Sequence, residues 1–208
     1  MWFLLSSVLL FAQPQSALQG GLQALSAQDD QLRRYRDESY LLSQPISASV
    51  FRNLLVFSTK TQRWEAAESS AEPSTSARVR VVHLWAHYCE PCQREFPVLK
   101  GLAQKAAAKH KGRVQYLFVA EDTPSEQMST FLQKNKPSMP EGRHFHDTQG
   151  QLRSALQLGL PTGELKLPTT ILVDEQGVVR QAFVGPLVEP TDRRPELLAA
   201  IDRLLSLP

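Results

Sequence analysis

The segment over residues 84–92 of the 208-residue chain reads Leu84-Trp85-Ala86-His87-Tyr88-Cys89-Glu90-Pro91-Cys92, and no other segment says as much about the architecture. It contains both cysteines of the sequence, three positions apart. The apolar segment 79–85, which leads into the pair, predicts a buried strand, and the segment from the cysteines to about His110 predicts a helix. The cysteine pair is therefore expected at the junction between a strand and a helix.

Two thiols at positions i and i+3 of a first helical turn can form a small disulfide with little backbone movement. The first thiol, that of Cys89, would lie at the positive end of the helix dipole, where unpaired N–H groups favour the thiolate. Such a pair can exchange two electrons between its dithiol and disulfide forms. A purely structural disulfide is the alternative, but so small a loop adds little stability. A closed zinc site needs about four ligands, and the sequence has no second cysteine pair. Redox chemistry is favoured.

Downstream of the pair, segments typical of strands alternate with amphipathic segments. Strands are expected over residues 114–120, 143–146, 169–174 and 178–184, and helices over residues 125–135, 151–158 and 195–205. Residues 175–177 connect the last two strands as a hairpin. This order predicts an α/β sandwich with a mixed sheet.

The composition is that of an ordinary globular protein, with 42% hydrophobic and 21% charged residues. The net charge of +2 is too small to favour binding to nucleic acid or to an anionic membrane. Two cysteines are compatible with either side of the cell membrane, so they do not decide the compartment.

Two signatures make residues 78–208 resemble the thioredoxin-fold TlpA/ResA-like thiol–disulfide oxidoreductases. The first runs from Leu84 through both cysteines to Glu95-Phe96-Pro97, and the second runs from Leu167-Pro168 to Gly177. The resemblance implies a thioredoxin-like domain over 78–208, with a central mixed sheet flanked by helices. It also implies that the redox-active pair itself is the reaction centre, with no other cofactor and no metal.

Within this resemblance Cys89 is the expected nucleophile and the more exposed thiol, and Cys92 is expected to resolve the mixed disulfide. The negative charge of Glu90 disfavours the thiolate and so favours a reductant over an oxidant. Pro91 lies in the first turn of the helix, where its missing N–H costs no hydrogen bond.

Three further residues are expected to support the pair. Glu95 follows Cys92 by three positions, lies on the same helix face and matches a glutamate of the family. As a buried carboxyl it would exchange protons with the thiols. The alternative is a solvated glutamate on the helix surface. Pro168 matches the cis-proline that packs against the disulfide in the family. Trp85 is expected to pack under the site and to report the redox state by its fluorescence.

Histidines offer weaker candidates. His83 stands where thioredoxins have a buried aspartate, so it would accept a proton from Cys92; the alternative is a core histidine bonded to the backbone. His87 would stabilise a thiolate or simply face solvent. His144 and His146 share one face of a strand, but with no third ligand evident they are expected to be surface residues.

The N-terminal part has a different character. Residues 1–17 begin with a short apolar run that fits the core of a signal peptide or a short hydrophobic leader, although no Lys or Arg precedes it. Residues 18–77 form an N-terminal extension, in which residues 51–57 and the region of Trp64 predict a β-hairpin and residues 68–77 a polar linker. The protein is expected to be exported to an extracytoplasmic, for example periplasmic, location. Attachment to the membrane through the N-terminal segment is one form that this location would take.

Together these features predict an enzyme that reduces disulfides in exported proteins, as in cytochrome c maturation or oxidase assembly. Its partners would be protein disulfide substrates and an upstream membrane thiol reductant. Two alternatives remain open: a disulfide-forming oxidase or isomerase, and an assembly factor that binds Cu(I) through the same cysteines.

Overall fold

The computed structural model describes residues 41–58, 61, 63–66, 77–121, 126–135, 139–140, 142–156 and 166–207. The expected leader over 1–17, most of the polar linker and the segment 157–165 lie outside these residues. One compact unit extends from Glu38 to Pro208. Among the described residues, none of the helices is both long and apolar enough to cross a membrane.

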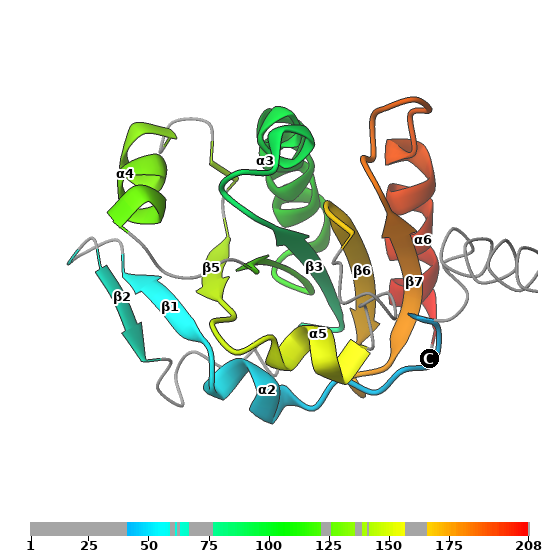
Figure 1. The fold of residues 1–208 in the computed structure, drawn as a ribbon. Helices are drawn as coiled ribbons and strands as arrows, with labels where there is room; N and C mark the ends of the chain where they lie inside the picture. Colours follow the sequence, from blue (N-terminus) through cyan, green and yellow to red (C-terminus); the bar gives the residue numbers. More distant parts are fainter. Residues whose placement is uncertain are drawn as a thin grey trace, which may run out of the picture. The chain divides into compact units, whose positions relative to one another are not determined.

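The described strands form one seven-stranded mixed sheet in the order β2-β1-β5-β4-β3-β6-β7 (Figure 1). The strands are β1 (Leu55–Ser58), β2 (Arg63–Ala66), β3 (Val79–Trp85), β4 (Val114–Ala120), β5 (Arg143–His146), β6 (Thr169–Asp174) and β7 (Val179–Val184). Strand β3 is central: it pairs in parallel with β4 and antiparallel with β6. All seven of its residues are buried, as expected for a strand covered on both faces.

Helices cover both faces of this sheet. They are α2 (Ala48–Arg52), α3 (Glu90–His110), α4 (Glu126–Asn135), α5 (Gln151–Leu156) and α6 (Arg194–Ser206). Buried side chains of α3, α4 and α6 form one core with one face of the sheet, while those of α2 and α5 form a second core with the other. The expected thioredoxin-like α/β sandwich is confirmed.

Side chains of β3 alternate between the two cores because successive residues of a strand point to opposite faces. Val81 and Trp85 belong to the core under α3, whereas Val82 and Leu84 belong to the core under α2 and α5. His83 therefore points to the α3 side, the side on which the cysteines lie.

The hairpin expected in the N-terminal extension is formed by β1 and β2, and β1 also pairs antiparallel with β5. The sheet thus continues across the domain boundary expected at residue 78. The prediction that Phe51 belongs to the first strand of the hairpin is wrong, because this residue lies in helix α2 and the strand begins at Leu55. Phe51 is 3% exposed and its ring lies 5.8 Å from that of Phe145, so tertiary packing decides its local structure.

Candidate active site

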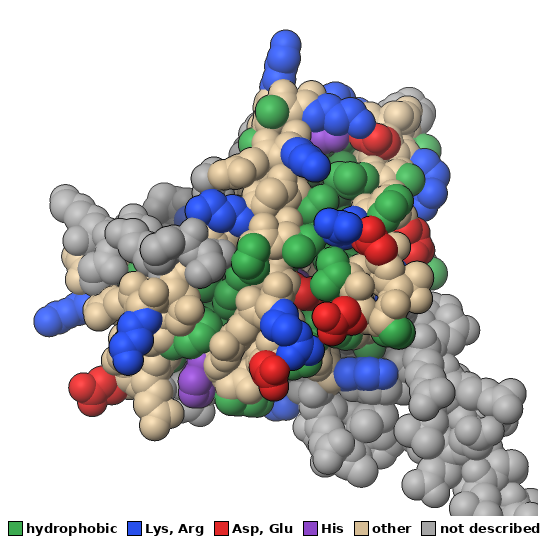
Figure 2. Space-filling view, turned by 90° about the horizontal axis from the view of Figure 1, so that it is seen from above, with side chains coloured by type: hydrophobic (Ala, Val, Ile, Leu, Met, Phe, Trp, Pro, Cys, Tyr) green, Lys and Arg blue, Asp and Glu red, His purple; other side chains and the backbone are tan. Residues whose placement is uncertain are grey.

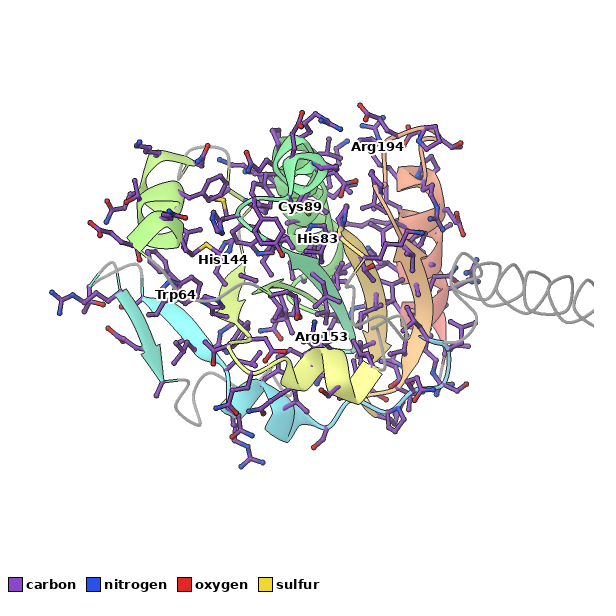
Figure 3. All side chains as sticks on the ribbon, viewed as in Figure 1. Trp64, His83, Cys89, His144, Arg153 and Arg194 are labelled. Carbon is purple, nitrogen blue, oxygen red and sulfur yellow. A yellow bond between two sulfur atoms is a disulfide. The ribbon has the colours of Figure 1, made fainter. Side chains whose placement is uncertain are left out.

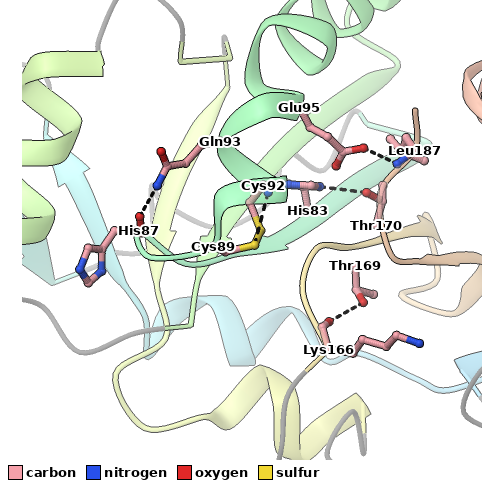
Figure 4. The surroundings of a disulfide bond; sticks show 10 residues. All are labelled: His83, His87, Cys89, Cys92, Gln93, Glu95, Lys166, Thr169, Thr170 and Leu187. Carbon is pink, nitrogen blue, oxygen red and sulfur yellow. Dashed lines mark hydrogen bonds between the residues drawn. A yellow bond between two sulfur atoms is a disulfide. The ribbon is translucent and has the colours of Figure 1, made fainter. Parts of the chain in front are cut away.

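Cys89 and Cys92 form a disulfide at the start of α3, with 5.3 Å between their Cα atoms (Figure 4). Cys89 is the N-cap residue: its backbone N–H donates to the carbonyl of Ala86 at 3.1 Å, and its carbonyl accepts from the N–H of Gln93 at 3.1 Å. The N–H of Cys92 donates to Sγ of Cys89 at 3.3 Å. Cys89 is 8% exposed and Cys92 is 0% exposed, so Cys89 is the more exposed cysteine, as expected for the nucleophile.

A loop that ends at β6 lies on the side of the disulfide opposite His87 in Figure 4. The peptide bond between Leu167 and Pro168 is cis, as the family resemblance implies. The carbonyl of Pro168 accepts from the N–H of Gly185 at 2.8 Å, and Oγ1 of Thr169 donates to the carbonyl of Lys166 at 2.9 Å. These bonds fix the loop next to the end of β3, where β6 begins.

His83 is fully buried, and its Nδ1 lies 2.9 Å from Oγ1 of Thr170 on the neighbouring strand β6. Its partner is thus a side chain and not the backbone. Its Nε2 has no hydrogen-bond partner among the described residues. Burial lowers the pKa of His83 to about 3, so the ring is neutral at physiological pH.

Glu95 is 1% exposed, so its carboxyl is not that of a solvated surface glutamate. Its Oε1 accepts a hydrogen bond from the N–H of Leu187, in the segment between β7 and α6. Burial raises the pKa of Glu95 to about 7; the N–H groups of Leu187 and Val188 oppose this rise, and the charge of Glu189 adds to it. The carboxyl group is therefore able to gain and lose a proton near neutral pH.

The first turn of α3 also carries an ion pair that the sequence analysis missed. Nη1 of Arg94 lies 2.7 Å from Oε1 of Glu90, and Nη2 of Arg94 lies 3.4 Å from Oε2 of Glu189. Arg94 therefore offsets part of the negative charge that Glu90 places beside the thiols. The i,i+4 spacing of Glu90 and Arg94 was the available signal. Pro91 occupies the first turn as expected.

Trp85 is fully buried, in the same core as both cysteines. Its ring meets that of Phe96 edge to face, with 5.0 Å between centroids, and lies 5.8 Å from the ring of Phe131 on α4. This aromatic group links the end of β3 to both α3 and α4.

The prediction that His144 and His146 are surface residues is wrong for His146, which is buried, while His144 is half-buried. His146 is 0% exposed, with its ring 4.9 Å from that of Trp64. His144 stacks on Phe118 at 5.1 Å, and burial lowers its pKa to about 4. His146 thus packs against the hairpin and His144 against β4; His144 and Trp64 are labelled in Figure 3. Within the described ranges, no three His, Cys, Asp or Glu side chains are grouped to hold a metal ion.

Comparison with known proteins gives relatives of moderate similarity. The chain is 30% identical over 125 residues to the thiol:disulfide interchange protein DsbE of Pseudomonas fluorescens and 29% identical over 108 residues to the thiol-disulfide oxidoreductase ResA of Geobacillus kaustophilus. It is 22% identical over 107 residues to the sporulation thiol-disulfide oxidoreductase A of Bacillus subtilis. These matches cover 60%, 52% and 51% of this chain, and 61%, 55% and 59% of the relatives' lengths.

A family match covers a larger part of the sequence. Residues 64–201 match the Redoxin family, from the second strand of the hairpin to the last helix. This range includes the cysteine pair, the cis-proline loop, His83 and Glu95. The chain belongs to the Redoxin family.

Proposed function

We propose that the chain is a thiol–disulfide oxidoreductase that reduces disulfides in protein substrates through Cys89 and Cys92. The observation that carries this proposal is the disulfide at the N-terminus of α3, in which Cys89 is the more exposed residue. The cis-proline loop on the other side of the site and the names of the relatives, which are thiol-disulfide oxidoreductases and a thiol:disulfide interchange protein, support it.

The reaction starts from the dithiol form. The thiolate of Cys89 attacks one sulfur of a substrate disulfide, forming a mixed disulfide and releasing the other substrate sulfur as a thiolate. The thiolate of Cys92 then attacks Sγ of Cys89, forming the Cys89–Cys92 disulfide and releasing the second substrate thiolate. Two electrons pass to the substrate, and both released thiolates take up protons.

Two buried groups lie near the disulfide, and their pKa values decide which of them can handle the protons. Cys92 must lose its proton in the second step although it is fully buried. Neutral His83 has an unoccupied Nε2 on the α3 side of the sheet, and Glu95 titrates near neutral pH. We assign to Glu95 the role of taking up the proton of Cys92 and exchanging it with the surroundings, because its pKa lies near neutral. His83, whose pKa is lowered to about 3, is too weak a base to hold that proton and is assigned a positioning role as a neutral ring.

The finer features of the function follow from the family resemblance. Substrates are proposed to be disulfides of exported proteins, such as those that mature in cytochrome c or oxidase assembly. An upstream membrane thiol reductant returns the pair to the dithiol, and no further cofactor or metal takes part. The apolar run in residues 1–17 supports a location outside the cytoplasm.

The test combines a potential with an activity. The reduction potential of the Cys89–Cys92 pair is titrated against dithiol buffers and followed by tryptophan fluorescence, and insulin reduction is measured with the wild type, Cys89→Ser and Cys92→Ser. A potential near or below about −270 mV with insulin reduction that needs both cysteines supports the proposal. A potential near about −120 mV identifies a disulfide-forming oxidase. Stoichiometric retention of Cu(I) without insulin reduction identifies a copper-binding factor.

A further inference from the structure

A shallow groove lies between the active-site loop and α4. It has a volume of about 430 Å³, with His87 on the loop side and Gln127, Thr130, Phe131 and Lys134 among its residues on α4. Figure 2 looks onto the helical face of the molecule, on which Lys and Arg side chains are spread among acidic ones. Side chains of both signs also line the groove itself, namely Glu126 and Lys134.

The groove begins at the active-site loop, because His87 is one of its lining residues. His87 lies two residues before Cys89, and its carbonyl accepts a hydrogen bond from Nε2 of Gln93 at 2.5 Å, which ties the loop to the first turn of α3. Between them, Tyr88 is 69% exposed and its ring meets that of His87 edge to face at 5.5 Å. A polypeptide joined to Cys89 must leave the sulfur in two directions. The cis-proline loop lies on one side of the disulfide and His87, which lines the groove, lies on the other (Figure 4), so a segment that leaves on the second side would run towards the groove.

The residues of the groove fit a polypeptide segment. Phe131 is half-buried and offers an apolar surface, while the exposed Gln127 and Thr130 can bond to a peptide backbone. Glu126 and Lys134 place opposite charges towards the two ends of α4. The groove is shallow, and its lining combines one apolar side chain with several polar ones. Such a lining suits an extended polypeptide with one apolar side chain better than an ion or a compact ligand.

We propose that this groove binds an extended segment of the protein substrate that flanks its reacting cysteine, with an apolar side chain seated on Phe131. This rests on the proposed oxidoreductase function and names the surface that separates protein substrates from small disulfides. Phe131 also contacts Trp85, in the core that contains both cysteines. Occupation of the groove is therefore expected to alter the fluorescence of Trp85.

The test blocks the groove with Thr130→Arg and uses Gln133→Arg as the matched control. Both residues are exposed on α4, so the two variants add the same charge to the same helix. Only Thr130 lines the groove, so only Thr130→Arg blocks it. Turnover is measured with insulin as the protein disulfide and with hydroxyethyl disulfide as a small neutral one. Thr130→Arg is expected to lower kcat/KM for insulin by about tenfold or more, with turnover of hydroxyethyl disulfide and the reduction potential unchanged.

Three outcomes would overturn the proposal: an unchanged kcat/KM for insulin in Thr130→Arg, an equal loss for both disulfides, or an equal loss in Gln133→Arg. Gln127→Arg provides a second blocked groove if Thr130→Arg does not fold. A wild-type protein that reduces neither disulfide refutes the oxidoreductase function itself, which is a different result. Disulfide-linked peptides with Phe or Gly beside the cysteine add a direct check, because the wild type is expected to prefer Phe and Thr130→Arg to lose that preference.

Discussion

Glu95 and His83 are both buried beside the disulfide, yet burial moves their pKa values in opposite directions. The pKa of Glu95 rises to about 7 and that of His83 falls to about 3, because burial disfavours the charged form of each. At neutral pH the site therefore contains a neutral imidazole and a carboxyl group that is partly protonated. The two groups are therefore expected to change the stability with pH in opposite directions.

Glu95→Gln is expected to remove a loss of stability that the wild type shows as the pH rises. The folded state binds the proton of Glu95 more tightly than the unfolded state, whose carboxyl titrates near 4.5. The stabilisation that Glu95 gives through this proton is fully present below that pH and is lost as the pH rises through about 7. The loss in the free energy of unfolding amounts to roughly 2–3 kcal/mol. Urea unfolding of the oxidised protein between pH 4.5 and 8 measures the difference between the two proteins. A difference that does not change with pH would contradict the assigned titration.

His83→Gln is expected to act in the opposite sense. The folded state binds the proton of His83 less tightly than the unfolded state, so the stability is present above about pH 6.5 and is lost as the pH falls towards 3. Between pH 6.5 and 4 the wild type should lose roughly 3 kcal/mol relative to the Gln variant. Urea unfolding of the two proteins gives this slope. Equal slopes for the wild type and His83→Gln would contradict the lowered pKa of His83.

The sequence predicts contacts between residues that are close together in the chain. It does not predict contacts with partners that are distant in the chain. The spacing of Cys89 and Cys92 predicts the disulfide because both lie in one helical turn. Oε1 of Glu95, in contrast, binds the N–H of Leu187, which lies 92 positions away, and His83 pairs with Thr170, 87 positions away. The second pair depends on the register of β3 against β6, which no local pattern in the chain specifies.

At the scale of elements, α2 shows how tertiary packing decides local structure. This helix has only five residues, too few to be stable alone. It is fixed by burial of Phe51 in the core under α2 and α5, against Phe145 of β5. The apolar run around Phe51 resembles a strand when taken alone, which is why the sequence predicts the wrong element there. The long strands and α3, which have strong patterns of their own, agree with prediction to within one residue.

Phe51→Ala is expected to destabilise the protein by about 3–5 kcal/mol, since it leaves a cavity between α2 and β5. Leu42→Ala, at a side chain that is 40% exposed, serves as the control and should cost well under about 1 kcal/mol. Chemical denaturation of both variants gives the two values. A small loss for Phe51→Ala would mean that α2 contributes little to the second core.

On the scale of the whole molecule, the sheet makes residues before and after position 78 parts of one structure. Strands β1 and β2 cover the edge of β5, and the compact unit begins at Glu38. The sequence predicted the hairpin but placed it outside the domain, because its pairing with β5 joins segments almost 90 positions apart in the chain, as in Val56 with Phe145. Such contacts leave no mark in local composition.

A chain that starts at Arg78 is therefore expected to be much less stable than one that starts at Glu38. It lacks Phe51 and Leu54 of the second core and exposes the edge of β5, which favours aggregation. Thermal unfolding should give a Tm lower by more than about 10 °C for the shorter chain, or aggregation before unfolding. Equal Tm values for the two chains would show that the domain is complete from residue 78.

The disulfide of this protein closes a ring within one helical turn, since its cysteines are three positions apart. Opening that ring frees almost no length of chain, so we expect reduction to leave the two cores and the sheet of the described residues unchanged. A secreted domain stapled by long-range disulfides would loosen and expose cleavage sites each time it was reduced. This protein can pass through any number of catalytic turnovers without offering proteases a newly released segment.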